Sequence, residues 1–432
     1  SDNDYIMKDI STNTFEIEEN IFGRLDTTLV EKVVDAKRFH NRHLSIYGDL
    51  QLSLLNRTWA DRLDLTFAIS NRDDQRQNGQ RITRNPGGEA TSKLTSFIQM
   101  LKYEKSLLFD IDLNYFGTFS YTRSEIDDST RNTYDWEGNI LPFENERGSE
   151  ILGRPSLREG DNTATSHRIL LTKEVLPGHR LTVNNFFAFS RIEGNDPVGT
   201  RLMLGGDPLD PNTIPADFYR NISGIELKSR WLNKDALETT LFGKYYLYDA
   251  ESIDIFATNV TLLPVRKNRD DLGGFGAGIK YSFNSNFALR GSFERTLRIP
   301  TEGEIFGNFG FIVPNYTLDA EESDNLNAGF VFNRKFGLDW QSRFDANVFS
   351  RVQRDLIRLE AFGLGELAQF INEDEITASG LEFSTELSFR NNLRFSGSLT
   401  FQELIIAASE NIEDRSFIDV KLPNIPDFFW NI

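Results

Sequence analysis

The stretch HLSIYGDLQLSLL, residues 43–55, alternates apolar and polar side chains along almost its whole length. The apolar set comprises Leu44, Ile46, Leu50, Leu52 and Leu54, and the polar set comprises Ser45, Asp49, Gln51 and Ser53. Successive side chains of a β-strand point to opposite faces, so this period of two predicts a strand with one apolar and one polar face.

The same alternation recurs along most of the chain. It is clearest in residues 63–69, 109–121, 181–189, 275–283 and 338–348. We count roughly fourteen or fifteen such segments. The 36 Phe, 12 Tyr and 5 Trp residues also favour strands, because aromatic side chains suit a pleated, half-buried surface.

Several predicted strands are longer than those of a typical soluble protein. Residues 110–124, 235–249 and 337–351 each form a run of about 15 residues, against about 5 to 6 in an average strand. A soluble β-sandwich or propeller is the alternative, because such a sheet also has one packed and one wet face. The number and length of the segments favour closure, so we predict an all-β fold, a large antiparallel transmembrane β-barrel.

The expected connections alternate between short and long. Short turns are expected at residues 176–178, 233–234, 284–286, 334–336 and 391–392. Long polar segments are expected at about residues 71–92, 126–163, 193–220, 251–271 and 300–321. The long loops would therefore gather at one end of the barrel, which is the outer end in outer-membrane barrels.

Charge and composition exclude several classes of function. The formal net charge of -18, from 65 acidic and 47 basic residues, argues against a nucleic-acid partner, which requires clustered positive charge. The chain has no cysteine, so it offers no disulfide and no thiolate site. No window approaches about 18 consecutive apolar residues, and the first ten residues do not resemble a signal peptide.

Two later segments carry a resemblance to a known family. RIPTEGEIF, residues 298–306, followed by NYTLDAEESDNLNAGF, residues 315–330, resembles the C-terminal half of the barrel of TonB-dependent outer-membrane receptors. The matching positions are Arg298, Pro300, Glu304, Asn315, Leu318, Glu321, Ser323, Asn325 and Gly329. Ala320 stands where the family usually has Pro, and Asn327 where it usually has Glu, but the spacing is kept.

The resemblance continues in FINEDEITASGLEFSTEL, residues 370–387, through Asn372, Gly380 and Glu382. It implies that residues 43–432 are part of a barrel that has about 22 strands in the complete family fold. Residues 1–42 are expected to be an irregular start, either a first barrel strand or a connection from a plug domain. Within them, residues 27–39 suit a short helix or an irregular strand.

The function implied by the resemblance is active transport across the outer membrane of a Gram-negative bacterium. The substrate would be a scarce, bulky nutrient such as siderophore-bound iron, haem, cobalamin or an oligosaccharide. Outer-membrane lipid would surround the barrel, and the TonB complex would act through a plug domain. We expect the plug and the final strands to lie outside this sequence. The alternative is a secreted or surface-exposed β-rich glycan-binding protein without transport activity.

No catalytic residues, metal site or cofactor are expected. Gly-x-Ser-x-Gly, His-Glu-x-x-His and P-loop patterns do not occur. The run GGFGAG, residues 273–278, lies inside an alternating segment, which favours a strand bend or close packing over a nucleotide loop. His40 and His43 are spaced as a metal pair but have no third ligand nearby in the sequence.

Loop aromatic residues are the candidate ligand contacts, with an interfacial girdle or loop packing as the alternative. They are Tyr134, Trp136, Phe306, Phe309 and Phe311. The acidic side chains of residues 319–324 could bind Ca²⁺, but a solvated cluster at the barrel rim is favoured. The substrate itself is not encoded in the matched motifs. The acidic balance disfavours a strongly anionic ligand, unless the local charge differs from that of the whole chain.

Overall fold

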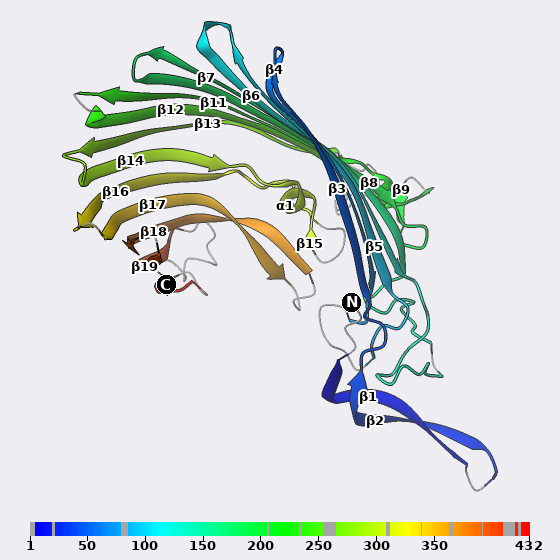
Figure 1. Ribbon diagram of the computed structural model, residues 1–432. Coiled ribbons are helices and arrows are strands. Elements are labelled where there is room, and N and C mark those ends of the chain that lie inside the picture. Colours follow the sequence, from blue (N-terminus) through cyan, green and yellow to red (C-terminus); the bar gives the residue numbers. More distant parts are fainter. Residues whose placement is uncertain are drawn as a thin grey trace.

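Figure 1 shows one long, curved antiparallel sheet with a separate hairpin at one end. The computed structural model describes residues 5–19, 22–78, 85–142, 144–199, 201–204, 207–232, 235–253, 265–307, 312–337, 339–362, 367–390, 392–408, 420–421 and 425–432. Phe309 and Phe311, two of the candidate ligand contacts, fall outside these ranges.

Within the described residues the large sheet has sixteen strands, of which all but β15 pair in an unbroken antiparallel order. From one edge to the other they are β3 (His43–Arg57), β4 (Ala60–Gln75), β5 (Thr91–Leu107), β6 (Ile111–Asp128), β7 (Ser156–Leu176), β8 (His179–Asn195), β11 (Ala216–Trp231), β12 (Leu237–Ile253), β13 (Val265–Ser282), β14 (Phe287–Arg298), β16 (Glu321–Phe336), β17 (Trp340–Phe362), β18 (Leu367–Phe389), β19 (Leu393–Ala408) and β20 (Phe428–Asn431). The short strand β15 (Ile312–Val313) runs parallel to β18. The predicted all-β antiparallel architecture is confirmed.

The other described elements are short. Strands β9 (Leu202–Leu204) and β10 (Asp207–Leu209) pair in the connection between β8 and β11. The helices are η1 (Leu108–Asp110), η2 (Pro211–Thr213) and α1 (Glu302–Phe306). A helix long and apolar enough to cross a membrane does not occur in the described ranges.

The two faces of the sheet differ in chemistry, as the alternation predicts. On β12, Tyr246 and Tyr248 are buried in the core around α1, which lies on the concave side (Figure 1). Their neighbours Leu241 and Tyr245 therefore point to the convex side, where they are 56% and 48% exposed. A convex face that exposes large apolar side chains strand after strand is suited to lipid rather than to water.

Aromatic side chains surround the end of the sheet that has the short turns. They are exposed at Trp59, Phe109, Trp231, Phe283, Phe336 and Trp340, each within or beside such a turn. Trp and Phe at one level of a sheet form the kind of belt that marks a membrane–water interface. The residues of this belt differ from the loop aromatic residues for which an interfacial girdle was the alternative to a ligand contact.

The strands extend further toward the long-loop end than the sequence predicts. β6 runs to Asp128 and β7 begins at Ser156, so the expected loop at residues 126–163 is shorter at both ends. Polar side chains pair across these extensions, as Arg123 does with Asp161 at 2.9 Å. Both faces of an extension beyond the membrane can be wet, so its residues show no alternation although the backbone ladder continues.

The glycine-rich run of residues 273–278 lies within β13, as predicted. A Cβ atom at Gly276 would collide with the ring of Phe242 on the neighbouring strand. The glycine therefore makes room for an aromatic side chain, and the close-packing interpretation is confirmed at this position.

The N-terminal residues form a regular hairpin, β1 (Ile6–Glu19) with β2 (Leu25–Lys37), which is separate from the large sheet. The segment for which a helix or an irregular strand was considered is thus a strand as far as Lys37. Trp136, from the β6–β7 connection, is fully buried against Met7 and Ala36 of the hairpin. The backbone N–H of Trp136 donates to the Thr12 hydroxyl at 3.1 Å. This aromatic side chain anchors the hairpin to the loops of the sheet, together with the Asn13–Asn85 hydrogen bond at 3.3 Å and the Lys32–Glu137 ion pair at 3.5 Å.

We expect Trp136→Ala to release the hairpin without unfolding the sheet. Loss of a fully buried Trp removes about 3 to 5 kcal/mol of packing, and that packing involves the hairpin and its loop rather than the strands of the sheet. Limited trypsin digestion of the folded protein should therefore cut faster at Arg24, Lys32 and Lys37. The control is Trp59→Ala, because Trp59 is 53% exposed at a short turn. Unchanged cleavage of the Trp136 variant would show that the hairpin is held elsewhere.

Candidate functional site

The connection between β14 and β16 lies on the concave side of the sheet in its described parts, residues 299–307 and 312–320, and we call these parts the strap (Figure 1). Its helix α1 contacts both β12 and β18, which are separated in the sheet by β13, β14, β16 and β17. Thr301 caps the helix in a reciprocal arrangement with Glu304, and Gly307 ends it with a positive φ of 68°. The predicted outer loop is therefore folded back into the concave side of the sheet.

A charged network fixes the start and the end of the strap to the sheet. The guanidinium of Arg298 donates to Glu304 at 3.0 and 3.1 Å and to Glu321 at 2.5 Å. The Glu321 carboxylate also accepts from the Gln353 side chain at 3.1 Å and from the Ile357 backbone N–H at 2.8 Å. Glu321 is only 6% exposed, so these donors replace the water that its charge would otherwise require.

The far side of the strap is held by amide side chains. Asn315 donates to the Phe370 carbonyl at 2.8 Å, and Asn372 accepts from the Asp319 backbone N–H at 2.9 Å. The Asn372 amide also donates to the carbonyls of Asp319 at 3.1 Å and Asp355 at 2.8 Å. The structure thus brings Asn315 and Asn372, 57 positions apart in the numbering, to the same seam between the strap and β18.

An apolar core lies between the strap and the sheet. Ile305, Phe306 and Leu318 are at most 2% exposed. They contact a set of buried side chains from the sheet and the strap ends, which includes Phe218, Tyr246, Tyr248, Leu297 and Ile357. Burial of three large apolar side chains contributes several kcal/mol, so the strap is packed as a small domain core is packed.

The remaining family-motif positions lie outside the Glu321 network. Pro300 is fully buried at the start of the strap. The others, along the strands, are Ser323, Asn325, Gly329, Gly380 and Glu382. The Ser323 hydroxyl donates to Asn325 at 3.1 Å, and a Cβ atom at Gly380 would collide with the Phe349 ring. Their visible roles are local packing and hydrogen bonding within the sheet.

The acidic cluster at the end of the strap is divided between two faces. Glu321 points to the concave side, whereas Glu322 and Asp324 lie on the alternate face and pair with arginines. Arg354 binds Glu322 at 3.0 Å and Asp324 at 3.2 Å, and Arg295 binds Asp324 at 2.7 Å. The cluster is therefore a set of cross-strand ion pairs rather than an open ring of carboxylates.

The histidine pair is also separated. His40 is buried with its Nε2 2.7 Å from the Ala90 carbonyl oxygen, while the His43 ring pairs with Asp74. Within the described part of the chain, no group of three His, Asp or Glu side chains is placed to hold a metal ion.

The candidate aromatic contacts have different environments. Phe306 is 2% exposed in the strap core and Trp136 is fully buried under the hairpin, so neither presents a surface to a ligand in this conformation. Tyr134 is partly exposed, and its hydroxyl donates to Glu89 at 2.7 Å. Burial and this hydrogen bond raise the pKa of Tyr134 to about 12. Hydrogen bonds from Asn132 and Tyr134 lower the pKa of Glu89. A ligand role for these aromatic residues stays a prediction.

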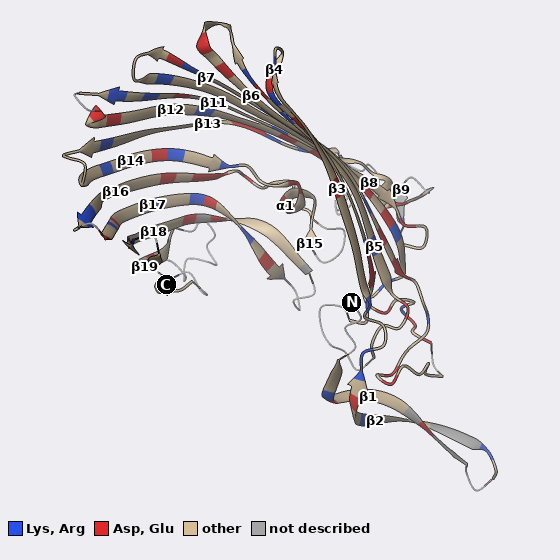
Figure 2. Ribbon diagram, in the orientation of Figure 1, with Lys and Arg blue, Asp and Glu red and all other residues tan. Residues whose placement is uncertain are grey.

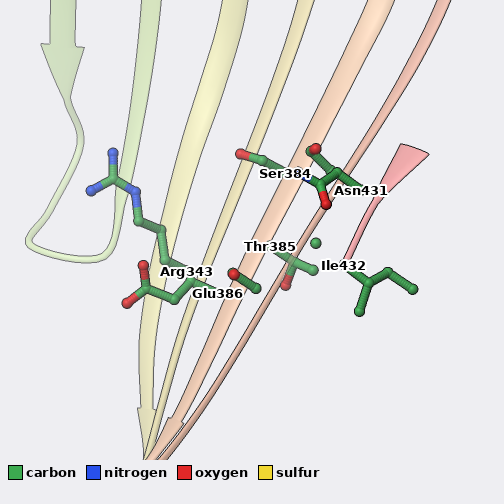
Figure 3. A pocket seen from close by; sticks show the side chains of 9 residues that line it. Arg343, Ser384, Thr385, Glu386, Asn431 and Ile432 are labelled. Atoms are coloured by element: carbon green, nitrogen blue, oxygen red, sulfur yellow. The ribbon is translucent and has the colours of Figure 1, made fainter. Parts of the chain in front are cut away.

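Charged side chains are distributed along the strands rather than collected at one end (Figure 2). On the concave face, Lys244 pairs with Glu294 at 2.8 Å and Arg290 with Asp345 at 2.6 Å. The same face carries a pocket of about 370 Å³ near β20, shown in Figure 3. Its lining is mostly polar: Arg343, Ser384, Thr385, Glu386, Ser396, Gly397, Ser398, Asn431 and Ile432. The concave wall is hydrophilic, as a water-filled lumen requires.

Sequence reasoning missed the partners that hold the strap. Tyr248 and Asn268 meet the Leu318 carbonyl, with the Asn268 amide donating at 2.6 Å. Gln369 donates to the Pro314 carbonyl at 2.7 Å. These side chains sit in ordinary strand positions, and their spacing gives no sign of the contact. The recognisable sequence pattern lies only in the part of the chain that these side chains contact, which is the strap.

A comparison with protein families shows which family the sequence of the large sheet matches. The sequence model for "TonB dependent receptor-like, beta-barrel" matches residues 34–432. Among curated proteins, a sequence comparison found no match. The family match covers β3 to β20 and the strap, and only the end of the hairpin.

Solved structures share the fold at low sequence identity. The copper transporter OprC is 14% identical with a TM-score of 0.61, and the alignment covers 100% of this chain and 64% of that chain. The siderophore receptor PiuA from Acinetobacter baumannii is 12% identical with a TM-score of 0.60, covering 100% and 69%. The FrpB iron transporter from Neisseria meningitidis (F5-1 variant) is 11% identical with a TM-score of 0.57, covering 93% and 57%. This chain therefore spans about 64% of the length of OprC.

We expect Glu321→Gln to loosen the strap. The neutral amide keeps the shape but weakens the hydrogen bonds to Arg298 and the Ile357 N–H, which should cost about 1 to 3 kcal/mol. Hydrogen–deuterium exchange of the folded receptor should then be faster in residues 299–307 and 312–320.

The control for this variant is Glu322→Gln, which removes the same charge from the opposite face of β16. It should leave strap exchange at the wild-type rate. Equal exchange in both variants and the wild type would contradict the role assigned to the Glu321 network.

Proposed function

Because this chain belongs to the TonB-dependent receptor β-barrel family, we propose that it forms the wall of an outer-membrane receptor that imports a scarce, bulky nutrient. The family match and the fold of its structural neighbours support the receptor class. The same membership supports a location in the outer membrane of a Gram-negative bacterium. No covalent chemistry belongs to this role, and energy would come from the TonB complex through a plug domain.

The observation that carries the proposal is the contrast between the two faces of the sheet. Large apolar side chains are exposed on the convex side, and an aromatic belt marks the short-turn end. The concave side carries ion pairs and a mostly polar pocket. A soluble glycan-binding sheet would not gain from exposing apolar side chains over its whole convex face, because each one costs free energy in water.

The substrate belongs to the same proposal. The neighbours are described as receptors or transporters of copper, iron or a siderophore, and at 11–14% identity they support only the class of small, scarce nutrients. Haem, cobalamin and an oligosaccharide remain candidates beside them. The strap occupies the concave side near the long-loop end, where an entering ligand would meet it first.

Transport can be tested by uptake in cells that carry or lack the complete gene. The panel comprises a ferric siderophore, haem, cobalamin and an oligosaccharide, each with and without a protonophore. We expect uptake of one class to be lost on deletion and to collapse when the proton gradient is removed. The complete protein should also require detergent for extraction. A native protein that is soluble and monomeric without detergent would overturn the proposal and favour the glycan-binding alternative.

A further inference from the structure

Several arginines on the concave wall have no hydrogen bond or ion pair to any described residue, and two of them lie on the strands on either side of β8. They are Arg168, at the middle of β7, and Arg220, on β11. Most other charged side chains of the strands are paired, as in the Lys244–Glu294 and Arg290–Asp345 bridges. Arg220 is partly buried and Arg168 is exposed on the wall. Unpaired cations in a chain with a net charge of -18 are conspicuous.

Both arginines point to the concave side of the sheet. Phe218 packs on the strap core, and Arg220 is two positions further along the same strand, so both side chains share a face. The Arg220 guanidinium lies over the Phe186 ring, 5.1 Å from its centre. Arg168 is the direct cross-strand partner of Phe186 and therefore shares that face as well.

Phe186 thus has an arginine on each neighbouring strand, and the guanidinium of Arg220 is stacked on its ring. The Arg220 stack orients its planar fork and reduces the torsional freedom that binding a ligand would otherwise remove. Arg168 stands directly opposite Phe186 on β7, on the same face of the sheet. An aromatic ring with an arginine on each neighbouring strand offers an apolar surface with charged, multidentate donors close to it.

No carboxylate neutralises this group from the neighbouring strands. The concave positions of β7 between residues 162 and 170 are Asn, Ala, Ser, Arg and Leu, and those of β8 between residues 184 and 192 are Asn, Phe, Ala, Ser and Ile. The carboxylate of Glu302, in the strap, attracts the Arg220 guanidinium electrostatically. Its hydrogen bond, however, is accepted from the Ser190 hydroxyl and not from Arg220. Glu302 therefore makes no hydrogen bond to Arg220, and the donors of both guanidinium groups have no acceptor among the described residues.

We propose that Arg168, Phe186 and Arg220 form a subsite for a carboxylate-bearing part of the imported ligand, beneath the edge of the strap. Carboxylates match the fork of an arginine better than spherical anions do, and the Phe186 ring favours a ligand with an adjoining apolar surface. This inference rests on the proposed transport function for its biological meaning. The binding itself is a property of the wall and can be measured without transport.

The test is calorimetric titration of the complete receptor, purified in detergent at low ionic strength, with citrate as the carboxylate probe. Inorganic phosphate serves as a second anion and choline as a cation. The variants are Arg168→Gln, Arg220→Gln, both together, and Arg220→Lys. The matched control is Arg394→Gln, which removes the same charge from an arginine paired with Glu386 at 2.6 Å.

We expect each Arg168 or Arg220 substitution by Gln to raise the Kd for citrate about tenfold or more, as for the loss of one charge-assisted hydrogen bond. Arg220→Lys should recover part of the affinity, because it restores the charge but not the planar fork. Arg394→Gln should bind as the wild type does, and choline should not bind. The heat-dependent migration of the folded barrel in gels confirms that each variant is folded.

Three results would overturn the subsite: no citrate binding by the wild-type receptor, equal binding by the wild type and the double variant, or phosphate binding more tightly than citrate through the same arginines. Citrate binding that depends on both arginines, in a receptor for which no uptake can be found, would support the subsite and reject the transport proposal. Uptake that continues in the double variant, together with no citrate binding by the wild type or any variant, would support the transport proposal and reject the subsite.

Discussion

A backbone N–H or C=O group that faces lipid without a partner costs several kcal/mol, and this constraint organises the whole chain. In the antiparallel order of the large sheet, each strand from β4 to β19 satisfies it by pairing with a strand on both sides, whereas β3 lies at the edge of the sheet and pairs with β4 alone. Once the backbone groups are hydrogen-bonded, the side chains alone determine which face of the sheet contacts lipid and which contacts water. The period of two then assigns apolar residues to the convex face and ion pairs to the concave face.

The strap is the second consequence of this arrangement. A connection that turns into the concave side must bury an apolar core against the wall and find hydrogen-bond partners there. Ile305, Phe306 and Leu318 supply the core, and the carboxylate of Glu321 joins the strap ends to β17. The residues that make the sequence segment recognisable are those that hold this connection. They carry structural information about the receptor class and say little about the ligand.

The membrane strands could be predicted from the sequence because lipid enforces alternation on them. Residues 43–55 show it, and they fall within β3. The upper parts of the strands could not be predicted, because Arg123 and Asp161 lie where both faces are wet.

The contacts of the candidate site were hidden for a different reason, which is their distance in sequence. Glu321 meets Gln353 and Ile357, 32 and 36 positions away, and the Trp136 backbone meets Thr12, 124 positions away. Local patterns contain no signal for such pairs. The sequence therefore gives no sign that Trp136 is buried under the hairpin, and its role as a ligand contact stays a prediction.

The net charge of the whole chain likewise does not predict the charge at one place on the wall. The net charge of -18 disfavoured an anionic ligand, yet the concave wall around Phe186 presents two arginines and no neighbouring carboxylate from β7 or β8. A ligand experiences the charge within about one Debye length, roughly 8 to 10 Å, and not the sum over the chain. The local arrangement of the wall therefore decides what it can bind.

The central claim is that the convex face meets lipid and the concave face meets water. The chain contains no cysteine, so single cysteines can be introduced at Ile225, Glu226, Leu227 and Lys228 of β11 and spin-labelled in lipid vesicles. Collision with oxygen, which dissolves in lipid, should dominate at residues 225 and 227. Collision with a water-soluble nickel chelate should dominate at residues 226 and 228. Equal access of the nickel chelate to all four positions would contradict the account.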